Sequence, residues 1–172
     1  MKLNPTTEKF ILHWGEMGTK WGVNRTVAQI HALLYILSRP MNAEEITETL
    51  GVARSNVSNS IKELQNLRLV HTVHILGDRR DHFETSDDVW TLFRTIAEVR
   101  MQREIEPTRQ FLQSLIDSPE FSQENETAKQ RIQQTHDFIS TLTVWANEML
   151  KLSTSTMVKI LKIGAGIQKF FR

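Results

Sequence analysis

Apolar and polar positions alternate at helical spacing through residues 42–67, in two short runs. The apolar positions are Ala43, Ile46 and Leu50 in the first run and Val57, Ile61 and Leu64 in the second. Asn42 is a favourable N-cap, Glu45 completes a capping box, and Gly51 supplies a left-handed stop. A second helix is expected from about Arg54 to Leu67. Two short helices joined by a short turn that contains glycine predict a helix-turn-helix.

The polar face of the second helix carries short hydrogen-bonding side chains rather than the glutamates and lysines of an ordinary solvated face. Its candidate contact residues are Arg54, Ser55, Asn56, Ser58, Asn59 and Lys62. Serine and asparagine can meet base edges and phosphate oxygens when a helix N-terminus enters the major groove of DNA. A plain amphipathic helix whose serines and asparagines face water is the alternative, and the helix alone does not decide between them.

Residues 70–85 predict a two-stranded β-hairpin, which favours the DNA interpretation. Val70, Val73 and Ile75 mark one strand, Gly77 and Asp78 a turn, and residues 82–85 the returning strand. The tip places Arg79 and Arg80 side by side in an exposed loop, and arginine is favoured in a narrow minor groove. Asp78 and Asp81 can pair with these arginines and hold the tip in shape. We therefore expect one arginine to be structural and the other to contact DNA.

Three segments resemble those of a known family. They are FILHWGEMGTKWGVNRTVAQIHALLYILSRP, LGVARSNVSNSIKELQNLRLV and GDRRDHFETSDDVW. With them, residues 5–95 resemble the winged-helix regulators of the MarR type, most of all the branch named for the glycine-betaine-synthesis regulator, GbsR. The resemblance implies a mainly α fold: a winged helix-turn-helix with a β-hairpin wing, a helical dimerisation region and a homodimer. Ala53 stands where such motifs place a serine or threonine N-cap, and Ser55 is expected to take over part of that role.

Two amphipathic helices are expected ahead of this motif, the first opened by Pro5. Gly15, Gly18 and Gly22 lie along the first helix with a spacing similar to that of a phosphate-binding loop. A strand before them and a GK[ST] ending are both missing, so the spacing predicts close helix packing.

The pattern divides the chain into a DNA-binding domain, residues 1–86, and a helical dimerisation and effector region, residues 87–172. In the second region Pro107 is expected to kink or restart a long helix, and residues 122–127 to form a loop. The final segment, Thr154 to Phe171, is basic on one side and apolar on the other. Such a helix can lie on an anionic membrane. Packing against a partner helix is favoured, because several amphipathic helices need a surface to cover their apolar faces, and a homodimer supplies one.

Composition excludes some classes of function. Net charge is only +1, and residues 86–150 carry six basic and eleven acidic side chains while residues 151–172 carry five basic and no acidic ones. A DNA reader needs local positive charge, so this distribution is compatible with one. Without cysteine, thiol-based redox sensing and cysteine-bound zinc are excluded. The longest apolar run is too short to span a bilayer and no signal-peptide pattern is present, so a cytoplasmic protein without a membrane partner is expected.

The sequence offers no catalytic motif and calls for no cofactor, so an enzyme is not expected. His71, His74 and His82 cluster in the hairpin and suggest a metal site. Residues 71 and 74 point to opposite faces of a strand, so at most His74 and His82 could converge. Histidines that face solvent or contact phosphate are the preferred interpretation, and no metal is expected.

An effector is suggested by the resemblance, which implies a small ligand of the choline or osmoprotectant class. A quaternary ammonium needs a cage of aromatic rings. The candidate walls are Trp14, Trp21, Trp90 and Trp145. Each lies on or beside an apolar stripe, so a place in the core is the competing interpretation.

Together these features predict a homodimeric, sequence-specific transcriptional regulator on a pseudo-palindromic operator. Ser55, Asn56, Ser58 and Asn59 are expected near bases, Lys62 on phosphate, and Arg79 or Arg80 in the flanking minor groove. The dimer would change transcription, as a repressor or an activator, by occluding or recruiting polymerase, and a ligand would change the spacing of the two recognition helices. The alternative is a winged-helix module that binds proteins and no DNA.

Overall fold

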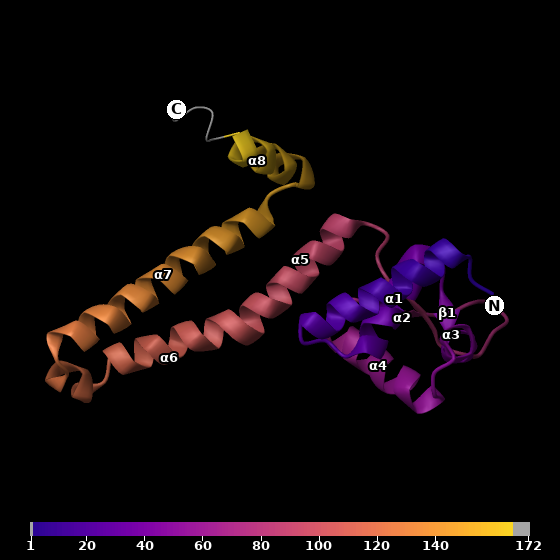
Figure 1. Cartoon of the computed structure of the whole chain (residues 1–172), viewed down its shortest axis with the longest axis horizontal. Helices are drawn as coiled ribbons and strands as arrows, with labels where there is room; N and C mark the ends of the chain where they lie inside the picture. Colours follow the sequence, from indigo (N-terminus) through magenta and orange to yellow (C-terminus); the bar gives the residue numbers. More distant parts are fainter. Residues whose placement is uncertain (1, 167–172) are drawn as a thin grey trace. The chain divides into compact units, whose positions relative to one another are not determined.

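The computed structural model describes residues 2–166, which form two compact units. The first unit ends at Thr95 and the second begins at Ile96, so the division lies inside helix α5 (Val89–Arg100). The other elements of the first unit are α1 (Pro5–Lys20), α2 (Arg25–Leu37), β1 (Met41–Asn42), α3 (Ala43–Leu50), α4 (Arg54–Asn66), β2 (His71–Val73) and β3 (His82–Glu84) (Figure 1).

The core of the first unit lies between the helices and the sheet. Helix α2 is the central element, since it packs against α1, α4 and β3. The fully buried side chains include Ile30, Leu33, Leu34, Met41, Ile46, Val57 and Leu64. Burying a side chain of this size stabilises the fold by about 1.5–3 kcal/mol relative to exposure. The apolar faces that the sequence predicts for α3 and α4 therefore pack into this core.

The helix-turn-helix has the local chemistry that the sequence predicts. Asn42 accepts hydrogen bonds from the backbone N–H groups of Glu44 and Glu45, and the Glu45 carboxylate accepts one from the backbone N–H of Asn42, which completes the capping box. Gly51 ends α3 with φ of 64°, in the left-handed region that glycine adopts at low cost. Helix α4 begins at Arg54, as expected, and ends at Asn66.

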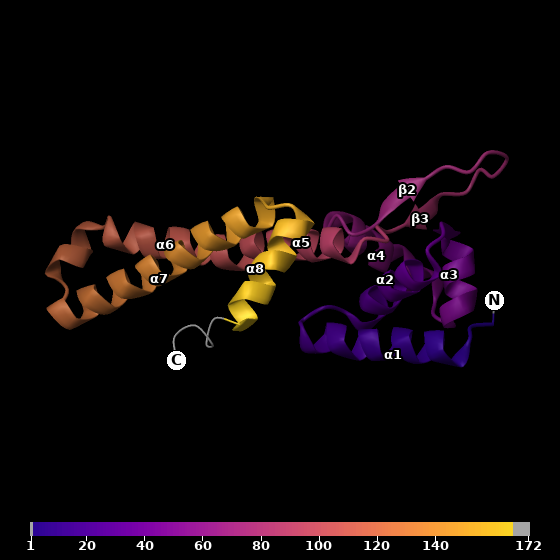
Figure 2. The same cartoon turned by 90° about the horizontal axis from the view of Figure 1, so that it is seen from above.

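The sheet has three antiparallel strands in the order β1-β3-β2, one more than the expected hairpin. The added strand is two residues long, and Met41 and Asn42 pair with Phe83 and His82. So short a strand has no apolar alternation for a sequence pattern to show. Strand β2 stops at Val73, so Ile75, expected in the strand, lies in the loop. We call β2, β3 and their connection the wing, and residues 75–81 the wing tip (Figure 2).

Glycines let α1 and α2 approach closely. A Cβ added at Gly18 would overlap the Cβ of Ala28, and one added at Gly15 would meet the side chain of Gln29. The predicted packing role is confirmed for these two residues. It is wrong for Gly22, which lies beyond the helix in a turn with φ of 77° and faces open space.

The second unit is helical throughout its regular structure. Helix α5 passes through a π-helical turn, η1 (Met101–Ile105), into α6 (Glu106–Ile116), followed by a 3₁₀ turn, η2 (Pro119–Gln123), α7 (Glu126–Lys151) and α8 (Thr154–Gly166). Proline has no N–H to donate to the preceding turn, which explains why the helix changes its winding next to Pro107. Helices α6 and α7 pack side by side (Figure 1).

One detail of this unit differs from the sequence prediction. The loop expected over residues 122–127 is wrong at both ends, because η2 reaches Gln123 and α7 starts at Glu126 behind an Asn125 N-cap. In α8, Met157 is buried but Ile160, Leu161 and Ile163 are exposed. The rest of the segment expected to reach Phe171, residues 167–172, lies outside the described part of the chain.

No helix within residues 2–166 has both the length and the apolar character needed to cross a lipid bilayer.

Candidate nucleic-acid interface

The polar face of α4 consists of Ser55, Asn56, Ser58, Asn59 and Lys62, and every one of these side chains is exposed. The opposite face of the helix holds Val57, Ile61 and Leu64 in the core. Burial of that face fixes the rotation of α4, so the polar face is presented to solvent as a rigid surface.

The N-terminus of α4 keeps its partial positive charge. Its N-cap, Ala53, offers no side-chain hydrogen bond, and the first turn contains no acidic residue. The expectation that Ser55 takes over capping is wrong: within residues 2–166 its hydroxyl has no hydrogen-bond partner, because it sits inside the first turn and points outward. The uncapped N–H groups thus favour an anion, such as a phosphate of a nucleic acid, at this end of the helix.

The wing tip is held by a tight turn and by an ion pair. The backbone N–H of Asp78 donates to the carbonyl of Ile75 over 3.0 Å, and Gly77 adopts φ of 86°. The guanidinium of Arg80 donates to both carboxylate oxygens of Asp78, over 2.9 Å from Nε and 2.6 Å from Nη2. These bonds from Arg80 hold the pKa of Asp78 well below its ordinary value, and those from Asp78 raise the pKa of Arg80.

Glu44, in α3, connects the wing to α4. One oxygen of its carboxylate lies 3.2 Å from Nη1 of Arg80, and the other lies 3.5 Å from Nη1 of Arg54. A single side chain therefore links the first residue of α4 to the wing tip. The sequence analysis did not identify Glu44, since a glutamate in the first turn of a short helix is ordinary helix chemistry.

Arg79 differs from its neighbour. It is exposed, and none of the described residues forms a hydrogen bond or ion pair with it. Arg80 is engaged by Asp78 and Glu44. The structure thus separates the two arginines that the sequence left equivalent.

The wing is also tied to α4 at its base. Nε2 of Gln65, near the end of α4, donates to the hydroxyl of Thr72 in β2 over 3.0 Å. Across the sheet, Nε2 of His71 lies 2.9 Å from the Glu84 carboxylate. Contacts at both ends of α4 thus position the wing.

The three wing histidines have different surroundings. His71 and His74 are exposed, as expected, whereas His82 is only 4% exposed. The exposed position expected for His82 is wrong because β1 covers its strand: its Nδ1 lies 3.0 Å from the Arg80 carbonyl oxygen. Among the described residues no group of three or more acidic or histidine side chains is arranged to hold a metal ion.

Within the first unit, the candidate tryptophans make two separate ring contacts. Trp14 and Trp21 form an edge-to-face pair with ring centroids 6.4 Å apart, and Trp90 makes a similar contact with Phe93. Trp145 belongs to the second unit. The competing interpretation of core residues is wrong for three of them, since Trp14, Trp21 and Trp145 are 36%, 54% and 60% exposed.

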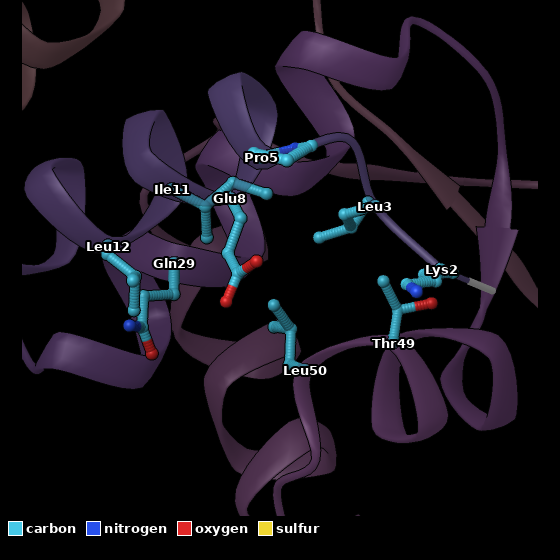
Figure 3. Close-up of a pocket in the computed structure, with 9 residues that line it drawn as sticks. All are labelled: Lys2, Leu3, Pro5, Glu8, Ile11, Leu12, Gln29, Thr49 and Leu50. Carbon is cyan, nitrogen blue, oxygen red and sulfur yellow. The ribbon is translucent and has the colours of Figure 1, made fainter.

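A pocket of about 380 Å³ lies away from these tryptophans, between α1, α2 and α3. Glu8, Ile11 and Leu50 are among the residues around it, and the Glu8 carboxylate points into the space (Figure 3). None of the residues predicted to bind DNA lines it.

Comparison with known proteins agrees with this geometry. The MarR family model matches residues 21–81, from the end of α1 to the wing tip. YvaV of Bacillus subtilis (strain 168), named as an HTH-type transcriptional regulator, is 25% identical over 89 residues, which are 52% of this chain and 50% of YvaV. OpcR of the same organism, named as an HTH-type transcriptional repressor, is 23% identical over 73 residues, 42% of this chain and 40% of OpcR. The chain spans half or less of the length of these curated relatives.

A crystal structure of a transcriptional regulator shares the fold. It superposes with a TM-score of 0.64 at 16% sequence identity, over 85% of this chain and 96% of that one. The mainly helical fold with a small antiparallel sheet, predicted from the sequence, is confirmed. Residues 21–81, which the MarR family model matches, fold as a winged helix-turn-helix.

Proposed function

We propose that this chain is a sequence-specific DNA-binding transcriptional regulator that acts as a homodimer on a pseudo-palindromic operator. One observation carries the proposal: Glu44 links the exposed polar face of α4 to a wing tip that bears an unpaired arginine. Duplex DNA is the partner that uses both features, because a helix fits the major groove while arginine is favoured in the adjacent minor groove.

In this proposal each exposed side chain has a role. Asn56 and Asn59 read base edges, with Ser55 and Ser58 beside them, and Lys62 contacts a phosphate. Arg79 enters the flanking minor groove. Arg80 holds the wing tip in shape, since its guanidinium is already engaged by Asp78 and Glu44.

The apolar surface of the second unit supports the proposal of a homodimer. Its exposed large apolar side chains include Phe111, Phe138, Leu142, Trp145, Ile160, Leu161 and Ile163. A second copy of the chain would cover such faces and present two α4 helices to half-sites about one helical turn, roughly 34 Å, apart. Analytical ultracentrifugation tests this step, and a monomer at micromolar concentration would contradict it.

The proposal extends to the GbsR branch and a choline-like effector, with the cytoplasm as the place of action. The support is limited to Trp14 and Trp21, whose perpendicular rings form two exposed walls suited to a quaternary ammonium. A tryptophan fluorescence titration with choline tests the ligand. A flat response up to millimolar choline in the wild type would remove the effector and leave the DNA-binding proposal intact.

The DNA-binding step is tested by salt dependence on an arbitrary duplex. A protein that neutralises several phosphates releases counterions, so its affinity should fall by about a thousandfold between roughly 50 and 200 mM salt. Lys62→Gln should make that dependence shallower. Absence of duplex binding at low salt would contradict the proposal and favour the alternative, a winged-helix module that binds proteins.

A further inference from the structure

Leu76 is the most exposed large apolar side chain of the described residues, with a relative exposure of 104%. It lies in the wing tip, two residues beyond His74 and three before Arg79. Its neighbour Ile75 is 43% exposed, so the wing tip presents two apolar side chains in succession.

The exposure of Leu76 is imposed by an ordered turn. The hydrogen bond from Asp78 N–H to the Ile75 carbonyl closes the turn around Leu76 and Gly77, and Gly77 supplies the positive φ that the turn requires. Arg80 then ties the following residue, Asp78, to Glu44 of α3. The wing tip, the loop between β2 and β3 in Figure 2, is therefore organised in advance and carries a fully exposed leucine.

The charged side chains of the wing tip largely neutralise one another, so an apolar contact with DNA can contribute to binding there. Asp78 and Arg80 neutralise each other, which leaves Arg79 as the unpaired cation and Asp81 as the remaining anion, 4.0 Å from Nδ1 of His74. Net attraction to phosphate at the tip is accordingly small. Contact with DNA there must draw on more than charge, and the walls of a minor groove are apolar deoxyribose rings.

We propose that Leu76 enters the minor groove beside Arg79, where its side chain packs against deoxyribose rings and wedges a base step open. This inference rests on the proposed DNA binding and adds to the wing a second residue that recognises DNA. Apolar wedges of this kind act at steps that unstack easily, so the flank of the operator should prefer a pyrimidine–purine step such as TA or CA.

The test is a hydroxyl-radical footprint, which reports the exposure of minor-groove sugars, on a duplex selected by the wild-type protein. Wild type should protect sugars at both flanks, and Leu76→Ala should lose that protection with about a tenfold loss of affinity. Leu76→Met keeps an apolar side chain of similar length and should retain the flank protection. Because the Leu76 side chain is fully exposed, Leu76→Ala should melt at the wild-type temperature.

The outcomes separate this inference from the function on which it rests. Flank protection and affinity unchanged in Leu76→Ala would overturn the inference while leaving DNA binding in place. Unchanged DNA binding together with a lower sedimentation coefficient would also overturn it, and would assign Leu76 to a protein contact. Failure of the wild type to protect any duplex would instead contradict the proposed function.

Discussion

The carboxylate of Glu44 lies 3.2 Å from the guanidinium of Arg80, across the gap between helix α3 and the wing tip. The same carboxylate lies 3.5 Å from Arg54, at the start of α4. In a winged helix these are the two elements that meet DNA, so their spacing determines whether both can bind at once. In the proposed function Glu44 is thus a positioning residue that itself need not contact DNA.

Replacement of Glu44 by glutamine should weaken discrimination between DNA sequences. It removes a negative charge beside the interface, so binding to arbitrary duplex should become tighter at low salt. It also loosens the link between Arg54 and Arg80, so binding to the specific sequence should gain less affinity than binding to arbitrary duplex. The measurement is the ratio of specific to non-specific dissociation constants.

Glu48→Gln is the matched control for this variant. Glu48 is exposed on the same helix, and the structure gives it no ion pair within residues 2–166, so its replacement makes the same charge change without touching the link. An equal specificity ratio in the two variants would show that Glu44 acts through charge alone and would contradict its positioning role.

The two arginines of the wing tip should give different losses when replaced by alanine. Arg79→Ala should cost about 1–3 kcal/mol of DNA binding and leave the melting temperature unchanged, because Arg79 has no partner among the described residues. Arg80→Ala should release Asp78 and disorder the wing tip, which amide hydrogen exchange of residues 75–81 would detect. Faster exchange in Arg79→Ala than in Arg80→Ala would assign the structural role to Arg79 and the DNA contact to Arg80.

Base reading and phosphate contact on α4 can be separated by two variants. Asn59→Ala should relax sequence choice by about 1–3 kcal/mol at one position of the site, whereas Lys62→Ala should weaken all sequences alike. Binding of each variant to a panel of single-base operator variants distinguishes the two effects. If both variants lost affinity equally on every sequence, Asn59 would not be a base-reading residue.

The helix-turn-helix could be predicted from the sequence because its signals are local. The Asn42 and Glu45 capping box, the Gly51 stop and the apolar positions of α4 each act within a few residues. Strand β1 could not be predicted in the same way, because two residues carry no periodicity and the strand exists only through its pairing with β3.

The same distinction applies to the interface. Exposure of Asn59 and Lys62 follows from helical periodicity and was predicted. The different surroundings of Arg79 and Arg80 depend partly on Glu44, which is 36 residues away in sequence from Arg80. Long-range contacts of this kind also explain the burial of His82, which β1 covers.

Close packing of α1 on α2 predicts that Gly18→Ala is destabilising. The new methyl group would overlap the Cβ of Ala28, and strain of this kind costs about 1–3 kcal/mol. Gly164→Ala is the control, since Gly164 lies in a helix with open space around it and alanine should be neutral or slightly stabilising there. Urea unfolding measures both, and equal free energies of unfolding for Gly18→Ala and wild type would contradict the packing.

Burial of His31 predicts a loss of stability in mild acid. Desolvation lowers the pKa of His31 to about 4 from an ordinary value of 6.5, and its Nε2 lies 3.2 Å from the Thr85 hydroxyl. Near pH 6.5 the His31 side chain binds a proton in the unfolded chain but not in the folded chain. The contribution of neutral His31 to the free energy of unfolding is therefore complete above about pH 6.5. It falls by about 3 kcal/mol as the pH drops to about 4.

Urea unfolding from pH 7.5 to 4.5, for wild type and His31→Gln, checks this window. Hydrogen bonds from Arg109 lower the pKa of the Glu106 carboxyl to about 2. In the folded protein this carboxyl therefore titrates below the pH window of the experiment. The wild type should lose stability across the window, and the slope should be shallower in His31→Gln. The same slope in both proteins would show that His31 does not titrate as a buried, neutral side chain.

The most direct test of the whole account is a selection from random duplex DNA with the wild type and an Arg79→Ala/Arg80→Ala double variant. The account predicts that the wild type recovers a pseudo-palindrome with half-sites about one helical turn apart, and that the double variant recovers it more weakly. Recovery of no sequence by the wild type at low salt would contradict it.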